Sequence, residues 1–545
     1  MSAKPFEIGI VMSGAAMAGA YTAGVVDFLV EALDEWEKSR AQPDVPRHRV
    51  QLRVMTGASA GSLVTAASTW MMLDGQAPTR SSPADGASNA LHASWVERGG
   101  LEDLLGTRDL PDDESPLASL FDGYGIEAMA SRALGRDRST KIDLGAGLRA
   151  RPWIHPALEI AMTTSSLRGI PYAASYEGGA LHMRTCADHA RFVLGPRDEA
   201  RARDGAITLD PHDASSAGWE QLVRATLASC AVPMALPSRY LETPRRFYDD
   251  RIAVPGEPHA FVAPAWPEKM SDPYGSLYID GGLFENAPLD LAHRVLAGGR
   301  GLRNARDPKL ATRALVLIDP CPGFAAGEYA LEAPRTPDML RDLLAFGLAV
   351  VYQPRFQPED VALARSDRVA SRFMIVPTRK GHDGARFPLA STPIGAFAGA
   401  FHRSFREHDF FLGRRNCQQF LKRWLALDPD NALFEDGTSA HDVTWTCEDG
   451  ARVPKRPIIP LVGTARQEVR QPGWPSVETA ALRRALEGPF RQRLARVVRA
   501  LAHRTSFTPA RLFAARLPSQ WTAAPIASRV LDTCLAQLRE ARLTH

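Results

Sequence analysis

A serine framed by two glycines is the residue of this chain best suited to nucleophilic chemistry. The pentapeptide Gly57-Ala58-Ser59-Ala60-Gly61 follows the apolar stretch 50–55 and precedes the helix-like run 62–67. A sharp turn between a strand and a helix lifts a serine hydroxyl clear of its neighbours, and the flanking glycines remove side chains that would collide with the crossing backbone. The helix that begins there directs its N–H groups at a developing oxyanion. This context predicts that Ser59 is a nucleophile.

A loop of small residues near the N-terminus is the first companion of this turn. The apolar run 6–12 breaks into Ser13-Gly14-Ala15-Ala16, and an apolar helix-like segment follows. Small residues let consecutive backbone N–H groups converge on one anionic oxygen, as in an oxyanion hole or a phosphate cradle. A dinucleotide site would need Gly-X-Gly-X-X-Gly and an acidic residue ending the next strand, and a P-loop would need Gly-Lys-Ser/Thr. Neither pattern is present, so the loop favours an oxyanion hole.

An aspartate at a strand end is the second companion. The stretch 276–279 runs into Asp280-Gly281-Gly282, which places a carboxylate on a loop where another backbone can approach closely. Alone, Asp-Gly is a common turn dipeptide. In order with the other two segments, Asp280 becomes a candidate catalytic base.

Taken together, these segments resemble the patatin-like phospholipase family, which carries an oxyanion loop on its first strand, a Gly-X-Ser-X-Gly turn and a downstream Asp-Gly-Gly. A fourth block, residues 222–233, is similar to the family's helix followed by Ala-Val-Pro. The resemblance covers residues 6–320 and implies a patatin-like three-layer α/β/α hydrolase core with insertions. It also implies Ser59 as nucleophile, Asp280 as proton acceptor, an oxyanion hole of Gly14, Ala15 and Ala16, and the motif glycines Gly57, Gly61, Gly281 and Gly282.

The implied reaction is hydrolysis of carboxylic esters of lipids, of the phospholipase A or lysophospholipase type, through an acyl-enzyme. Asp280 would take the Ser59 proton directly, and this requires a dry pocket that raises the pKa of the carboxyl. A Ser-His-Asp triad is the alternative, with His382, His402 and His408 as candidates. We favour the dyad because Ser59 follows only the second expected strand, whereas an α/β-hydrolase places its nucleophile after several.

The loop departs from the family pattern Gly-Gly-Gly-X-Arg-Gly. Ala15 and Ala16 stand where glycines are usual, and Ala18 stands at the arginine. Alanine at positive φ costs on the order of 1 kcal/mol, so we expect a loop that is strained or shaped differently. This departure keeps a second class of function open: a catalytically weak or inactive patatin-fold protein that binds lipids or partners.

Charge and cysteine content bear on partners and cofactors. A net charge of +3 and a pI near 8.5 are too mild to predict nucleic-acid binding. The 6 cysteines have no paired spacing, which indicates reduced thiols in a cytoplasmic protein.

His182, Cys186 and His189 lie in an expected strand without a fourth ligand nearby, so we predict no metal and no cofactor. The expected partner is a phospholipid or another acyl lipid, and the sequence indicates no oligomeric state.

We expect peripheral contact with the inner membrane surface. The apolar stretch 8–30 follows Glu7 and is interrupted by the small-residue loop, unlike a signal peptide. The run 491–499 is basic and amphipathic, and it either packs or docks on lipid. The region 394–427 is basic too, and its arginines face either solvent or anionic head groups; they are Arg403, Arg406, Arg414 and Arg415.

The length of 545 residues predicts one main domain with an appendage. We assign residues 6–430 to the patatin-like domain and residues 431–545 to a mostly helical extension. Insertions are expected near 73–115, as an exposed loop with a helix between 91 and 105, and near 243–273. The second is either a lid bordering the substrate entrance or an exposed insertion without function.

Overall fold

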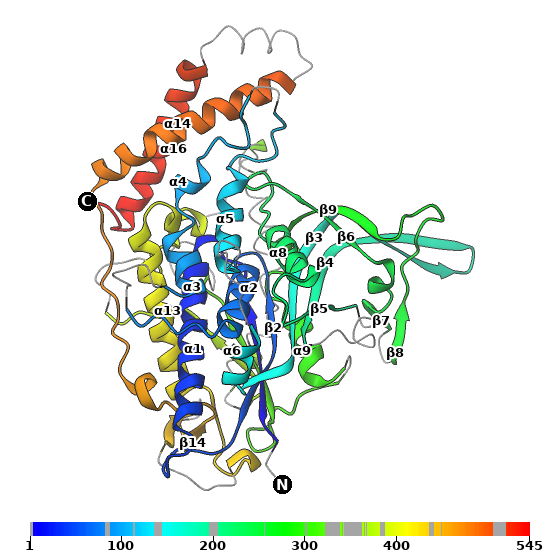
Figure 1. Cartoon of the computed structure of the whole chain (residues 1–545), viewed down its shortest axis with the longest axis vertical. Helices are drawn as coiled ribbons and strands as arrows, with labels where there is room; N and C mark the ends of the chain where they lie inside the picture. The colour runs from blue at the N-terminus through cyan, green and yellow to red at the C-terminus, as the bar shows by residue number, and fades with distance from the viewer. Residues whose placement is uncertain are drawn as a thin grey trace.

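A nine-stranded, mostly parallel sheet forms the centre of the protein (Figure 1). The computed structural model describes residues 4–81, 88–112, 115–135, 144–195, 205–254, 257–299, 302–321, 368–381, 387–434, 441–447, 450–504 and 519–545, together with 338–339, 342, 362–364 and 366. The sheet order is β11 (Arg372–Ile375), β10 (Arg313–Ile318), β1 (Phe6–Met12), β2 (Val50–Gly57), β3 (Ile154–Tyr176), β4 (Gly179–Leu194) and β5 (Ile207–Leu209).

The strands of this sheet do not all run in one direction. The strands from β11 to β3 are parallel to one another, whereas β4 and β9 (Tyr274–Asp280) both pair with β3 in the antiparallel sense. Strand β6 (Arg239–Thr243) in turn pairs with β9. The long strand β3 therefore carries neighbours that run in both directions.

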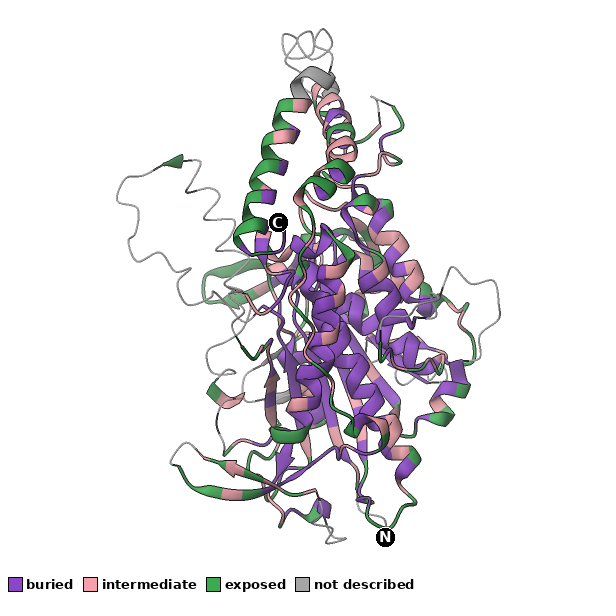
Figure 2. Ribbon diagram, turned by 90° about the vertical axis from the view of Figure 1, so that its left-hand side faces the viewer, coloured by how far each residue is buried: buried purple, intermediate pink, exposed green. Residues whose placement is uncertain are grey.

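Helices cover both faces of the sheet. The side chains of Ile8, Ile10 and Met12 belong to the main core, which includes α1 (Gly19–Ser39), α2 (Ala60–Leu73), α8 (Ala217–Ser229) and α13 (Arg403–Arg423). Val11 points to the opposite face, where it meets α9 (Leu289–Ala297). Figure 2 shows the resulting buried centre. The predicted α/β/α fold class is confirmed.

Helices α1 and α13 are packed backbone to backbone in the main core. A β carbon at Gly24 would overlap the Phe410 carbonyl group, and one at Gly413 would overlap the Tyr21 carbonyl oxygen. Of the described residues, one helical stretch, Ala16–Ser39, is long and apolar enough to cross a membrane, and 94% of its apolar window is buried inside the protein. The contact with α13 is one cause of this burial, and packing against α2 is another.

The arginines of α13 do not lie where the sequence suggested. Arg403 is exposed, but the exposed fractions of Arg406, Arg414 and Arg415 are only 1%, 2% and 8%. Arg414 pairs with two acidic residues of α1, Asp27 and Glu31, and Arg406 donates to the carbonyl oxygens of Val96 and Gly399. The expectation of a solvent-facing or head-group-facing cluster is therefore wrong for three of the four. The partners Asp27, Glu31 and Val96 are distant in sequence, so the local pattern resembled a surface helix.

The first expected insertion is folded onto the core. It contains α3 (Ala90–His92), the π-helical turn Ala93–Glu97 and α4 (Leu101–Leu104), so the helical part of the prediction is confirmed. Leu91, Trp95 and Val96 are buried, which contradicts an exposed loop over these residues. Two further helices follow, α5 (Gly123–Ala133) and α6 (Leu144–Ala150).

The second expected insertion is anchored to the outer part of the sheet. It holds a short helical turn, Arg245–Tyr248, and the hairpin of β7 (Ile252–Val254) and β8 (Glu257–Val262). The Tyr248 hydroxyl lies 3.1 Å from both the Tyr278 hydroxyl and an Asp188 carboxylate oxygen. The segment is thus fixed to the strand that ends in Asp280.

The C-terminal part combines a small sheet with two helices. Strands β12 (Ala426–Leu427), β14 (Arg452–Pro457) and β13 (Val443–Thr446) form the sheet, which spans the expected boundary at residue 430. Helices α14 (Thr479–Arg504) and α16 (Ser519–Glu540) pack on each other at one end of the molecule (Figure 1). Within the run 491–499, Arg493 is buried and donates to Asp109 and to the carbonyl oxygen of Leu120. Of the two roles expected for this run, Arg493 therefore has the packing role.

Candidate active site

Ser59 lies on a strained turn between β2 and α2. Its backbone angles are φ 50° and ψ −122°, a region that residues other than glycine rarely adopt. The turn is held by α8 and the residue after it, because the Ser59 amide donates to Ser229 Oγ at 3.0 Å and the Cys230 thiol donates to the Ser59 carbonyl oxygen at 3.1 Å. The strain is therefore maintained by contacts from another element.

Two glycines make this turn possible. A β carbon on Gly57 would lie 2.5 Å from the carbonyl carbon of Gly61, and a β carbon on Gly61 would overlap the Met12 carbonyl oxygen. Real β carbons do not approach other atoms so closely, so larger residues would force the turn open. The close packing of the backbone therefore requires glycine at positions 57 and 61, whatever the chemistry of Ser59.

The register of the sheet brings Asp280 to Ser59. Gly57 pairs with Met162 of β3, and Asp280 pairs with Thr164, two residues further along the same strand. Because β9 runs antiparallel to β3, its last residue meets the end of β2 from the opposite direction. Ser59 Oγ lies 2.5 Å from Asp280 Oδ2 and donates its hydrogen to it.

Asp280 is buried and carries a perturbed pKa. Its exposed fraction is 5%, and burial raises the pKa of its carboxyl from 3.8 to about 6. Hydrogen bonds from Ser59 and from the Gly282 amide, which lies 2.7 Å from Oδ1, oppose this rise. The expectation of a dry pocket that raises this pKa is confirmed, and the carboxylate remains largely ionised at neutral pH.

The candidate histidines are not bonded to this pair. His402 caps the start of α13 and lies 2.7 Å from Ser404 Oγ, and His408 is buried 2.8 Å from Asp409. His382 lies outside the described residues. Throughout the described part of the chain, no histidine is hydrogen bonded to Ser59 or Asp280, so the observed contact is a direct one between serine and aspartate.

The small-residue loop follows β1 and lies beside the turn. The Gly14 amide donates to the Asn286 carbonyl oxygen at 3.2 Å, so it is already occupied, contrary to its expected place in an oxyanion hole. The amides of Ala15, Ala16 and Ala60 have no acceptor among the described residues. Ala15 has an extended φ of −160°, whereas Ala16 has a φ of 42°, so the expected strain is confined to Ala16.

Asn286 and Ser229 position the site, although the sequence alone predicted no role for either residue. Asn286 makes two hydrogen bonds to Gly14: its carbonyl oxygen accepts from the Gly14 amide, and its Nδ2 donates to the Gly14 carbonyl oxygen, both at 3.2 Å. Ser229 receives the Ser59 amide and lies 2.7 Å from Ser62 Oγ. Asn286 lies four residues after Gly282 of the Asp-Gly-Gly loop and Ser229 lies in the fourth block, so their nearness to these motifs was the available signal.

An exposed apolar rim adjoins the site. We use this term for Leu120, Val232 and Met234, whose exposed fractions are 48%, 39% and 77%. The rim is tied to the site because the Asp280 amide donates to the Ala231 carbonyl oxygen, and the Leu120 amide donates to that of Met234. Apolar side chains beside a buried carboxylate suit a substrate with hydrocarbon chains.

The described residues hold no group of three or more histidine, cysteine or acidic side chains that could bind a metal ion. No disulfide joins the 6 cysteines, all of which are described.

Comparison with known proteins places this geometry in context. The family model described as patatin-like phospholipase matches residues 10–293. The chain is 32% identical over 530 residues to an uncharacterized protein, y4iI, of Sinorhizobium fredii, covering 88% of this chain and 74% of the relative. It is also similar to the crystal structure of VipD from Legionella pneumophila, at 11% identity and a TM-score of 0.22, over 98% of this chain and 92% of that chain. A TM-score of 0.22 supports no structural argument.

Proposed function

Because this chain belongs to the patatin-like phospholipase family, a family of lipid hydrolases, we propose that it hydrolyses carboxylic esters of phospholipids or other acyl lipids with a Ser59–Asp280 dyad. The observation that carries the proposal is the contact of 2.5 Å between Ser59 Oγ and Asp280 Oδ2, made by a buried carboxyl whose pKa is raised to about 6. A group with this pKa is ionised at neutral pH and is a stronger base than an ordinary aspartate.

The reaction would proceed in two halves. Asp280 Oδ2 takes the proton of Ser59 while Oγ bonds to the ester carbonyl carbon, and the carbonyl electron pair moves to oxygen. When this tetrahedral species collapses, the bond to the alcohol breaks and the alcohol takes the proton from Asp280. Water then attacks the acyl-Ser59 ester with Asp280 again as base, which releases the fatty acid and regenerates Ser59.

The oxyanion would be held by backbone amides alone. The Ala15 and Ala16 amides have no protein acceptor among the described residues, and neither does the Ala60 amide at the start of α2. The N-terminus of α2 adds a favourable dipole. We therefore assign the hole to Ala15, Ala16 and Ala60, and we give Gly14 a positioning role through Asn286.

The apolar rim supports a lipid substrate and peripheral contact with a membrane. Leu120, Val232 and Met234 would meet acyl chains that enter from a bilayer. Work at the inner membrane surface, in the cytoplasm, is part of this proposal.

The strained loop favours a second candidate. Ala16 adopts a φ of 42° where the family usually has glycine, and no arginine stands in this loop. A chain whose loop had lost its catalytic geometry would retain the fold and bind acyl lipids without hydrolysing them.

Release of fatty acid from phosphatidylcholine and lysophosphatidylcholine tests the proposal. Ser59→Ala and Asp280→Asn should each lower kcat at least a hundredfold. Ser68→Ala is the matched control, because Ser68 is buried on the same helix and bonds only to backbone oxygens of that helix among the described residues. His402→Gln should cost less than tenfold. Lipid binding by a folded wild-type chain without any ester hydrolysis would favour the second candidate.

A further inference from the structure

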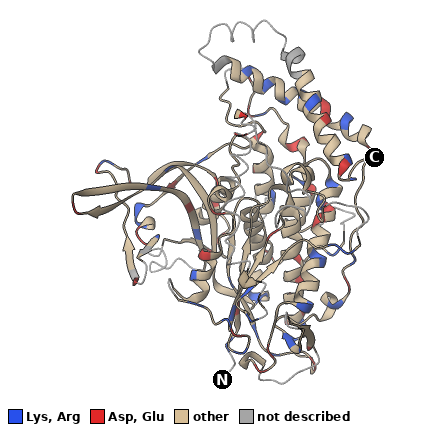
Figure 3. Ribbon diagram, turned by 180° about the vertical axis from the view of Figure 1, so that it is seen from behind, with Lys and Arg blue, Asp and Glu red and all other residues tan. Residues whose placement is uncertain are grey.

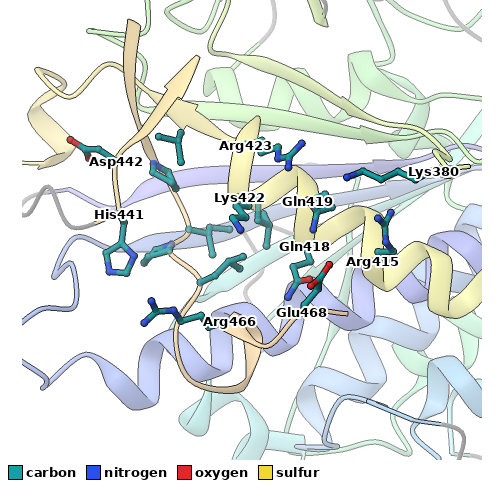
Figure 4. Close-up of a pocket in the computed structure, with 16 residues that line it drawn as sticks. Lys380, Arg415, Gln418, Gln419, Lys422, Arg423, His441, Asp442, Arg466 and Glu468 are labelled. Atoms are coloured by element: carbon teal, nitrogen blue, oxygen red, sulfur yellow. The ribbon is translucent and has the colours of Figure 1, made fainter. Parts of the chain in front are cut away.

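A cavity of about 430 Å³ lies along the C-terminal half of α13, and none of its lining residues belongs to the Ser59 site (Figure 4). Its walls come from α13, from the segment 457–468 and from residues 441–443, with Lys380 at its edge.

The cavity is strongly basic. Two carboxylates line it, Asp442 and Glu468, and Asp442 is already bonded to Arg456 at 2.6 and 3.0 Å. Its five cationic side chains are Lys380, Arg415, Lys422, Arg423 and Arg466. Among the described residues, these five make no ion pair and no side-chain hydrogen bond, so their charge is available to a ligand.

Arg415 is the most informative of the five. It is only 8% exposed, and none of its nitrogens has an acceptor in the described part of the protein. The neighbouring Arg414 is buried to a similar degree but is paired with Asp27 and Glu31. The Arg415 nitrogens are not among the fully buried polar atoms that lack a partner, so they border the open space of the cavity although most of the side chain is buried. An anion in the cavity would therefore meet guanidinium N–H donors that no protein acceptor occupies.

The walls are held in place before any ligand arrives. Gln418 donates to the carbonyl oxygens of Ala465 and Gln467, at 2.9 and 2.6 Å, and accepts from the Val469 amide at 2.9 Å. This clamp fixes the segment that carries Arg466 relative to α13. In Figure 4, Arg415, Lys422 and Arg423 all project from α13, with the adjacent Lys422 and Arg423 about two turns beyond Arg415. Such preorganisation lowers the entropic cost of binding.

We propose that this cavity binds a phosphate ester that carries two or more negative charges. A guanidinium matches the oxygens of a phosphate group with two parallel hydrogen bonds, and lysines add point charges. Five cations around one cavity exceed the need of a single carboxylate. The volume exceeds that of one phosphate group and falls in the usual range of small-molecule sites, and Leu421, Ile459 and Leu461 give it an apolar wall for the rest of the ligand.

Titration calorimetry with inorganic pyrophosphate at low salt tests the site. We expect saturable binding to the wild-type chain and a dissociation constant at least tenfold higher for Arg415→Gln. Because Arg415 is buried, the double variant Lys422→Gln/Arg466→Gln, with two exposed side chains, should show the same loss without risk to folding. The control Arg224→Gln/Arg484→Gln removes equal charge from exposed positions elsewhere and should bind as the wild type does. Absence of saturable binding, or equal affinity in all variants, would overturn the proposal.

Vesicles separate the two sources of such a phosphate. The Ser59→Ala chain, used to avoid turnover, is sedimented with phosphatidylcholine vesicles with and without phosphatidic acid. Retention that depends on phosphatidic acid and is lost in the double variant identifies a lipid head group. Pyrophosphate binding without that retention identifies a soluble phosphate ester. Either result supports the site, and both are independent of ester hydrolysis at Ser59.

Discussion

At the scale of single residues, the proposed chemistry depends on a carboxyl group that is kept from water. Burial makes Asp280 a better base, with a pKa of about 6, while its hydrogen bonds from Ser59 and Gly282 keep it mostly ionised at neutral pH. A stronger base would be protonated at working pH, and a weaker one would not take the serine proton. In the proposed mechanism, this environment lets Asp280 do the work of the histidine in a triad.

The pH dependence of activity follows from this pKa. Asp280 must be ionised to accept a proton, so kcat/KM should rise with pH along a single-proton curve with its midpoint near 6. The measurement is hydrolysis of a soluble ester between pH 4.5 and 8. A flat profile, or a midpoint below about 4.5, would show that the Asp280 carboxyl is not the base.

Stability should change in the opposite direction over the same range. The folded pKa of about 6 lies above the ordinary value of 3.8, so the native state holds the proton more tightly than the unfolded chain does. This contribution is intact below pH 4 and is lost as pH rises through 6, at a cost of as much as about 3 kcal/mol. Asp280→Asn should therefore unfold at higher urea concentration than the wild type at pH 8. The exposed control Asp430→Asn should show no such gain.

At the scale of elements, the sequence motifs were predictable, but the long-range contacts that hold them in place were not. The strand, turn and helix around Ser59 follow from local sequence, because glycines and apolar periodicity act over a few residues. The approach of β9 in the antiparallel sense depends on the register along β3, which pairs Thr164 with Asp280. Arg414 was mistaken for a surface residue because its partners, Asp27 and Glu31, lie nearly 400 residues away.

The oxyanion loop gives a prediction at this scale. Ala16→Gly relieves a φ of 42°, whereas Ala18→Gly changes a residue with an ordinary φ of −69°. We expect Ala16→Gly to be more stable than Ala18→Gly by about 1 to 2 kcal/mol in urea unfolding. Turnover of Ala15→Gly/Ala16→Gly should stay within tenfold of the wild type. A much larger increase from a barely detectable rate would mean that the native loop is vestigial.

Two adjacent arginines of α13 should behave differently. Arg414→Gln leaves the buried carboxylates of Asp27 and Glu31 without their cation and should lower the free energy of unfolding by about 3 to 5 kcal/mol. Arg415→Gln removes a charge without a carboxylate partner among the described residues and should cost far less. Urea unfolding of both variants checks this contrast, and equal losses would contradict the assigned pairing.

At the scale of the whole molecule, the exposed apolar rim of Leu120, Val232 and Met234 is connected to the site through the backbone bond from Asp280 to Ala231. Leu120→Ser/Met234→Ser should lower hydrolysis of phospholipid vesicles at least fivefold and leave turnover of a short soluble ester within twofold. Leu302→Ser/Leu310→Ser removes two leucines of comparable exposure, 53% and 66%, and should affect neither substrate. Equal loss on both substrates would place the rim in the catalytic site instead of at a membrane contact.

Labelling with a fluorophosphonate tests the central claim most directly, because this probe forms a covalent bond only with an activated serine. Peptide mass spectrometry of the labelled wild-type chain should find the adduct on Ser59. Labelling should be absent in Ser59→Ala, strongly slowed in Asp280→Asn and unchanged in the control Ser68→Ala. An adduct on another serine, or no adduct on a folded wild-type chain, would contradict the assignment of Ser59 and Asp280 as a catalytic dyad.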